Sequence, residues 1–255
     1  MNARTSLNRK PLTQKNHALI SGRSTPSRRS NHSTRLPLQR STPEVTWLEP
    51  AAQDRLLRQH SLLQARQGNY LEAITGFTIL IDRNPENATD YNNRGLVHFQ
   101  WGQQEAAIED YNEAIRLNPR LAAAYNNRAN YYAAQGELEA AIADYEMAVD
   151  LDPTNIRAWL NQGITFRDLG LYSDAIENFE HALQIKELMS VNLDDNALLE
   201  AHIYGARGRT HHLAGDWNYA MADYRRTLDL TSEFENSGKR LRIQVKNWME
   251  VLTYS

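Results

Sequence analysis

Residues 122–155 read AAAYNNRANYYAAQGELEAAIADYEMAVDLDPTN, and the segments on either side repeat this pattern. Residues 88–121 read ATDYNNRGLVHFQWGQQEAAIEDYNEAIRLNPRL, and residues 156–189 carry small and aromatic residues at the same places. Four glycines stand 34 residues apart, and an alanine follows each of them after five residues: Gly68 and Ala73, Gly102 and Ala107, Gly136 and Ala141, Gly170 and Ala175. A fixed period of this length indicates stacked repeats rather than one globular core.

Each repeat is predicted to form two helices. Its apolar residues recur at spacings of three and four, which is the pattern of an amphipathic helix. The glycine near the middle of each unit ends the first helix, because helices commonly stop at glycine. Pro119 and Pro153 mark the ends of two units, since the residue before a proline is pushed out of the helical region. The sequence therefore predicts an all-α repeat array.

Each unit has a small residue in its first predicted helix, such as Ala129, and another in its second, such as Ala141. These small residues let the two helices cross closely, while aromatic residues at neighbouring positions fill the space between units. This arrangement resembles the tetratricopeptide repeat family, with its W-x₂-L-G-x₂-Y…A-x₃-F…A…P pattern. The resemblance implies a right-handed α-solenoid of about five helix-turn-helix repeats, within residues 50–235. The expected repeats are residues 54–87, 88–121, 122–155, 156–189 and 201–234, with an insertion at 190–200. The YNNRG and YNNRA segments resemble repeats of bacterial and cyanobacterial proteins.

The two ends of the chain differ from the repeats. Residues 1–43 contain nine Lys or Arg, no Asp or Glu and no aromatic residue, so residues 1–45 are expected to form a disordered basic arm. The formal charge of the whole chain is −3, which leaves −12 on residues 44–255. Leu241, Val245 and Trp248 form one stripe of a predicted helix within residues 236–255, which is expected to cap the fifth repeat.

Asparagines recur along the first helix of successive repeats. Asn93, Asn127 and Asn161 stand 34 residues apart, and the same helices carry Asn92, Asn126 and Asn130. An amide side chain offers both a donor and an acceptor, so a row of amides can bind the backbone of an extended peptide. The resemblance supports this interpretation, because asparagines at this position clasp peptide backbones in some tetratricopeptide proteins. The alternative is that these amides bond only to neighbouring helices or to water.

Arginines on the same helices would add charge to the expected concave groove. The repeat offsets place six of them on or near it: Arg55, Arg58, Arg66, Arg157, Arg167 and Arg209. A guanidinium makes paired hydrogen bonds to carboxylates, which favours an acidic or C-terminal peptide as ligand. For any single arginine the alternative is a solvated side chain or a local ion pair, for example with Asp168.

No catalytic, metal-binding or cofactor-binding motif stands out. The chain has no cysteine, and its histidines are not spaced by four as metal-binding helical pairs are. Gly205-x-x-Gly208 lacks the lysine and hydroxyl of a phosphate loop. No nucleophile has a base and an orienting partner at a recognisable spacing. We therefore expect neither enzyme activity nor a cofactor, a metal or a small-molecule substrate.

Two function classes remain. The first is a protein–protein adaptor, scaffold or assembly factor that holds an extended segment or helix of a partner in the concave groove. The second is a nucleic-acid-associated or membrane-surface protein, in which the basic arm binds phosphates and the repeats recruit a protein. The arm lacks aromatic residues for base stacking and the rest of the chain is acidic, so we favour the first. We expect a cytoplasmic location; an Arg- and Ser-rich, acid-poor arm also resembles an organellar transit peptide.

Overall fold

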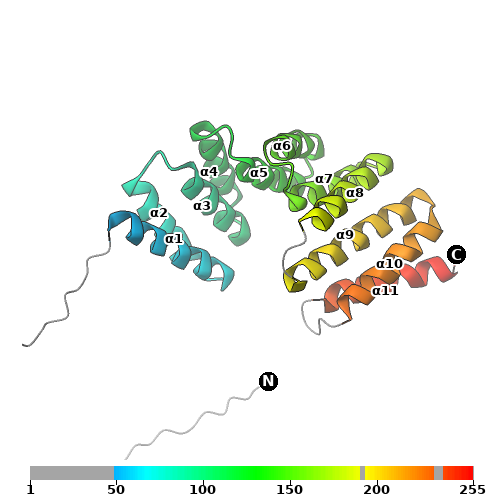
Figure 1. Ribbon diagram of the computed structural model, residues 1–255. Helices are drawn as coiled ribbons and strands as arrows, with labels where there is room; N and C mark the ends of the chain where they lie inside the picture. Colours follow the sequence, from blue (N-terminus) through cyan, green and yellow to red (C-terminus); the bar gives the residue numbers. More distant parts are fainter. Residues whose placement is uncertain (1–48, 190–192, 233–237, 255) are drawn as a thin grey trace, which may run out of the picture. The chain divides into compact units, whose positions relative to one another are not determined.

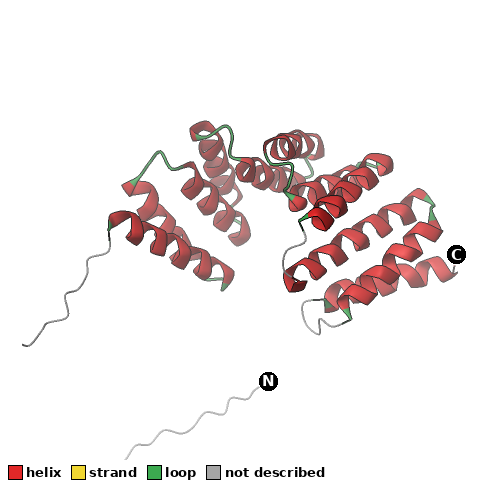
Figure 2. Ribbon diagram, in the orientation of Figure 1, coloured by secondary structure: helices red, strands yellow, loops and turns green. Residues whose placement is uncertain are grey.

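The computed structural model describes residues 49–189, 193–232 and 238–254. The prediction of an all-α solenoid is confirmed, since these residues form eleven helices and no strand (Figures 1 and 2). The expected arm, residues 1–45, lies outside the described residues, as do residues 190–192 of the expected insertion. The helices are α1 (Pro50–Arg66), α2 (Tyr70–Arg83), α3 (Ala88–Trp101), α4 (Gln104–Leu117), α5 (Ala122–Gln135), α6 (Leu138–Leu151), α7 (Ile156–Asp168), α8 (Tyr172–Leu188), α9 (Leu193–Ala214), α10 (Trp217–Thr231) and α11 (Lys239–Tyr254).

A glycine with positive φ stands between the two helices of each pair. The five glycines have φ between 79° and 88°: Gly68, Gly102, Gly136, Gly170 and Gly215. A Cβ added at any of them would meet no atom within 4 Å, so the backbone conformation and not the available space favours glycine. The glycines that mark the period in the sequence are therefore the sharp turns that fold each unit into a helical hairpin.

The core of each pair combines small residues with one buried aromatic ring. Alanines 73, 107, 141, 175 and 220 are fully buried near the start of the second helices. One turn further on lie the buried rings of Phe77, Tyr111, Tyr145, Phe179 and Tyr224. A Cβ added at Gly163 of α7 would come within 2.7 Å of the Phe179 ring, so the absence of a side chain there permits the close crossing of α7 and α8.

Neighbouring pairs pack through both of their helices. Each second helix contacts the first helix of the next pair, and the first helices α1, α3, α5, α7 and α9 contact one another in succession. The first helices therefore form one continuous face. Side chains on this face from different repeats lie side by side, although they are more than 30 residues apart in the sequence.

The C-terminal end differs from the regular repeats. α9 has 22 residues and includes residues 193–200 of the expected insertion as additional turns. α11 packs against α9 and α10, where Leu241 and Val245 are buried beside Ala201 and Tyr224. This helix covers apolar surface that a following repeat would otherwise cover.

Candidate interaction surfaces

The asparagines expected to bind a ligand lie on the first helices α3, α5 and α7, and most of them are bonded to one another. Asn127 Nδ2 of α5 donates to Asn92 Oδ1 of α3 over 2.9 Å. Asn161 Nδ2 of α7 donates to Asn130 Oδ1 of α5, also over 2.9 Å. These bonds cross from one repeat to the next, so the amides connect neighbouring repeats.

The remaining amides of this row have different surroundings. Asn126 Nδ2 donates to Asn127 Oδ1 over 3.3 Å, and Asn126 Oδ1 is buried with no hydrogen-bond partner among the described residues. Asn93 is half-buried, and within the described part of the chain its side chain has no hydrogen-bond partner. An amide has two N–H groups and two lone pairs, so an amide in one inter-repeat bond keeps further capacity. The row therefore connects the repeats and still presents donors and acceptors along their first helices.

The three arginines predicted for the site differ in their engagement. Arg157 of α7 is exposed, and its positive charge adds to burial in lowering the pKa of His202. Arg167 Nη2 lies 2.7 Å from Asp168 Oδ1 in a local ion pair. Arg209 of α9 lies over the Trp248 ring, at 5.4 Å from its centroid. The charges of Arg209 and Arg167 both act on Tyr224 of α10, whereas the charge of Arg157 acts on His202 of α9.

Among the other arginines expected near the groove, Arg58 has a role that sequence reasoning missed. Its Nε and Nη2 donate to the two carboxylate oxygens of Asp90, over 2.6 and 2.7 Å, and this bidentate pair joins α1 to α3. Arg55 and Arg66 are exposed on α1.

A periodic set of arginine–aspartate pairs was also missed. In three repeats an arginine of the first helix forms a bidentate pair with an aspartate sixteen residues later: Arg94 with Asp110, Arg128 with Asp144, and Arg207 with Asp223. These hydrogen bonds raise the pKa of each guanidinium above its usual value. The repeated spacing of sixteen was the signal in the sequence that could have revealed them.

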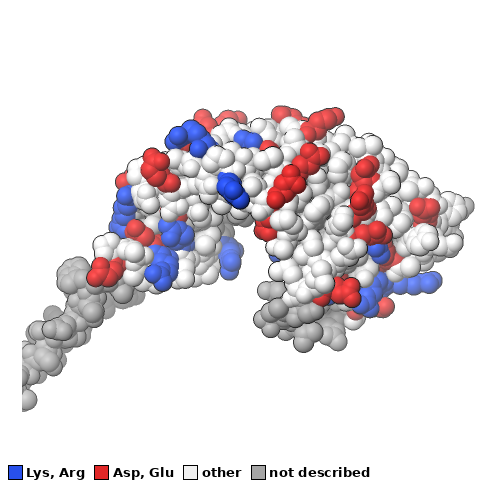
Figure 3. Space-filling model, turned by 45° about the horizontal axis from the view of Figure 1, so that its top comes forward, with Lys and Arg blue, Asp and Glu red and all other residues white. Residues whose placement is uncertain are grey.

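The charge of the described surface is uneven. Acidic side chains run in rows across the middle of the face shown in Figure 3, where few Lys or Arg side chains are visible.

Within the described residues, no group of three or more His, Asp or Glu side chains is placed to hold a metal ion. No described helix is long and apolar enough to cross a membrane.

Comparison with known proteins identifies the repeat. A family model described as TPR repeat matches residues 95–136, and two described as tetratricopeptide repeat match residues 122–155 and 156–187. No curated protein is similar enough to this chain to count as a match.

Several solved structures share the fold. A thermophilic TPR protein of Thermus thermophilus has 18% sequence identity and a TM-score of 0.62, covering 77% of this chain and 98% of its own. PilW, described as a widely conserved type IV pilus biogenesis factor, has 17% identity and a TM-score of 0.64, covering 77% of this chain and 86% of its own. MamA has 18% identity and a TM-score of 0.55, covering 73% and 98%. At these identities the likeness shows the fold alone. Together with the helical hairpins, the positive-φ glycines and the three family matches, it shows that this chain is a tetratricopeptide repeat protein.

Proposed function

We propose that this chain is a non-enzymatic adaptor, scaffold or assembly factor that binds an extended segment or a helix of a partner protein along its first helices. Tetratricopeptide repeat proteins are generally interaction modules rather than enzymes, which supports this class of function. Stacked repeats also present extended surfaces that suit a long, narrow ligand.

The observation that carries the proposal is the row of amides across α3, α5 and α7. Asn92, Asn127, Asn130 and Asn161 are connected across three repeats by two inter-repeat hydrogen bonds. Those bonds hold the amides in fixed orientations, and fixed donors lose less entropy on binding than mobile ones. A peptide backbone offers an N–H and a C=O at every residue, which matches the mixed donors and acceptors of the row.

We also propose that the partner segment is acidic. An acidic segment would place carboxylates near Arg157, which is exposed on α7. Arg58 and Arg167 already hold Asp90 and Asp168, so they contribute less to this preference. The preference for an acidic segment along the first helices therefore rests mainly on Arg157, together with Arg55 and Arg66, which are exposed on α1.

An affinity pull-down from a nuclease-treated native lysate, read by mass spectrometry, tests the proposal. Wild type is compared with Asn93→Ala and with the triple variant Asn93→Ala, Asn127→Ala, Asn161→Ala. The matched control replaces Asn218 and Asn247, which are exposed on α10 and α11, with alanine. Circular dichroism melting of every variant shows that each is folded at the temperature of the pull-down.

A protein that wild type and the control retain, and that the folded triple variant loses, supports the proposal. At about 0.5–1.5 kcal/mol for each hydrogen bond, loss of three amides weakens binding roughly ten- to a thousandfold. Recovery of the same proteins with all variants would contradict it and would direct attention to another surface.

A further inference from the structure

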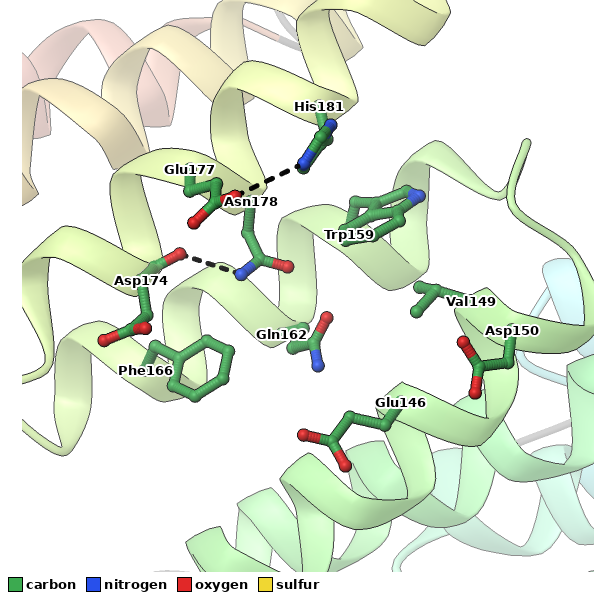
Figure 4. A pocket seen from close by; sticks show the side chains of 10 residues that line it. All are labelled: Glu146, Val149, Asp150, Trp159, Gln162, Phe166, Asp174, Glu177, Asn178 and His181. Carbon is green, nitrogen blue, oxygen red and sulfur yellow. Dashed lines mark hydrogen bonds and ion pairs between the residues drawn. The ribbon is translucent and has the colours of Figure 1, made fainter.

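A pocket of about 410 Å³ opens between the third and fourth repeats. It is lined by side chains of α6, α7 and α8 (Figure 4). Four carboxylates line it: Glu146, Asp150, Asp174 and Glu177. No Lys or Arg is among the described residues that line it. The imidazole of His181 also lines it, 3.8 Å from a Glu177 carboxylate oxygen and with its ring centroid 4.9 Å from that of Trp159, so carboxylates outnumber basic side chains in the lining.

In the repeats that have an arginine–aspartate pair, the arginine stands at the position equivalent to Gln162, which lines this pocket. Besides its aspartate, Arg94 donates to Thr78 Oγ1 of the preceding repeat over 3.2 Å, and Arg128 donates to Asn112 Oδ1 over 2.8 Å. Each guanidinium also lies over the ring of the tyrosine three residues before it: Arg94 over Tyr91 at 5.6 Å, Arg128 over Tyr125 at 5.7 Å, and Arg207 over Tyr204 at 5.4 Å. The guanidinium is thus surrounded by an acid, an acceptor from the preceding repeat and an aromatic face.

The fourth repeat keeps most of these surroundings but lacks the guanidinium. Gln162 stands where the arginine would be, and Asn178 stands where the aspartate would be. Trp159 supplies the aromatic ring, and Glu146 of α6 supplies the acceptor from the preceding repeat. Glutamine is shorter than arginine and uncharged, so the space that a guanidinium fills elsewhere remains as the pocket.

Two residues that line the pocket have a buried side-chain oxygen without a partner in the described part of the chain. Gln162 Oε1 and Asn178 Oδ1 accept no hydrogen bond from any described residue, although the two residues are only 4% and 7% exposed. Figure 4 shows the Gln162 amide between the Trp159 ring and the carboxylate of Glu146, with the Asn178 amide on the α8 side of it. A buried acceptor without a donor is unfavourable, so a ligand that brings N–H groups would satisfy both oxygens at once.

We propose that this pocket binds the arginine side chain of a partner protein. A guanidinium offers five N–H donors in one plane together with a positive charge, and it stacks on aromatic rings. It therefore matches the two amide oxygens, the Glu146 carboxylate and the Trp159 ring together. A lysine ammonium has three donors on a compact head, and it matches the aromatic wall less well.

The pocket is separate from the asparagine row. With 3.6 residues per turn, Trp159, Gln162 and Phe166 lie roughly 100–160° around α7 from Asn161. A partner could therefore occupy the row and the pocket independently. The triple asparagine variant is expected to retain the arginine site, so a failure of one proposal does not imply a failure of the other.

Fluorine NMR of the full chain labelled with 5-fluorotryptophan tests the site directly. The chain has five tryptophans, and the Trp159 signal is assigned with Trp159→Phe. The probe is Nα-acetyl-arginine methylamide, and its control is the citrulline analogue, which has the same shape without the charge. We expect a saturable shift of the Trp159 signal with the arginine probe and at least tenfold weaker binding of the citrulline probe. An unchanged Trp159 signal, or equal binding of the two probes, would overturn the proposal.

Two variants connect the binding to the pocket. Gln162→Arg together with Asn178→Asp reproduces the pair seen at Arg128 and Asp144, so an internal guanidinium should fill the site. This variant is expected to lose probe binding and to melt roughly 2–4 °C higher. Glu146→Gln removes an exposed carboxylate and is expected to weaken binding of the arginine probe at least threefold with unchanged helix content. Undiminished binding in either folded variant would refute the assignment.

Further titrations distinguish the source of the cation. A lysine analogue and spermidine should each bind at least threefold more weakly than the arginine probe, and tighter binding of either would overturn the choice of guanidinium. A full-length variant in which the seven arginines of residues 1–43 are replaced with glutamine should bind the probe as wild type does. Tenfold tighter binding by that variant would mean that the chain fills its own pocket, which would overturn the assignment to a partner.

Discussion

Arg128 donates two hydrogen bonds to Asp144, with Nε at 2.7 Å from Oδ2 and Nη2 at 2.8 Å from Oδ1, and so joins α5 to α6. The Asp144 side chain is buried, and the Arg128 side chain is 20% exposed. A third hydrogen bond, from Arg128 Nη1 to Asn112 Oδ1, extends the contact to α4 of the preceding repeat. A single side chain therefore connects two helices of one repeat with the repeat before it.

Replacing Arg128 with glutamine should lower the free energy of unfolding by about 2 kcal/mol, because Asp144 would remain buried without its charged partner. Urea unfolding followed by circular dichroism measures the change. The matched control is Arg116→Gln, which breaks an exposed pair with Glu113 on α4 and should leave stability unchanged. Equal effects of the two substitutions would show that the buried pair does not stabilise the third repeat more than a surface pair does.

Adding Asp144→Asn to Arg128→Gln should recover part of this loss, because an uncharged amide is less costly to bury than an unpaired carboxylate. The double variant has the same residue types as Gln162 and Asn178 in the fourth repeat. A double-mutant cycle on these two positions measures the coupling between them. A coupling near zero would mean that the two side chains stabilise the repeat independently.

The asparagine substitutions should lower the free energy of unfolding by different amounts. Asn127→Ala removes the donor to buried Asn92 Oδ1 and should lower it by about 1–3 kcal/mol. Asn161→Ala should lower it by about 1 kcal/mol, because Asn130 Oδ1 keeps the hydrogen bond from the Tyr145 hydroxyl. Asn93→Ala should leave the melting temperature unchanged. Thermal melting of the three single variants gives the order, and a reversed order would contradict the hydrogen bonds described here.

Ala141 tests how closely α5 and α6 cross. It is fully buried, so Ala141→Leu adds three carbon atoms where no space exists and should cost about 1–3 kcal/mol or more. Ala143→Leu, at an exposed position two residues further along α6, adds the same atoms toward solvent and serves as the control. Urea unfolding compares the two, and we expect only the first to move the midpoint.

The sequence was sufficient for the repeat architecture because that architecture depends on local signals. Glycines 34 residues apart mark the turns, and buried alanines and aromatic rings follow at fixed offsets. These offsets reflect the helical period and need no knowledge of how the repeats pack. The stripe of Leu241 and Val245 was recognisable for the same reason, and it is buried against α9 and α10.

The contacts between repeats were harder to predict. The sequence placed Asn127 and Asn161 on one face, but which amides bond depends on the offset between neighbouring first helices. That offset pairs Asn127 with Asn92 of the preceding repeat, and not with Asn93 at the equivalent position. The pocket was also missed, because it depends on Gln162 at a place where other repeats have arginine. Only a comparison of arginine positions across the repeats could have revealed it.

Acid should destabilise the fifth repeat through His212. Its Nδ1 lies 3.3 Å from Arg209 Nη1 of α9 and 3.2 Å from the hydroxyl of Tyr224 on α10. Burial and then the charge of Arg209 lower the pKa of His212, and burial raises the pKa of Tyr224 to about 12, which keeps its hydroxyl protonated. The imidazole therefore takes up a proton more readily in the unfolded chain than in the folded one.

A folded-state pKa below the unfolded value means that the contribution of His212 to stability is complete above pH of about 6.5 and falls as the pH drops below it. Urea unfolding between pH 7.5 and 5 should therefore show a loss of stability that is smaller in His212→Gln. His60→Gln, at an exposed site on α1, controls for the loss of an imidazole elsewhere. If wild type and His212→Gln lost stability in parallel over this range, protonation of His212 would not contribute to the acid sensitivity of the fold.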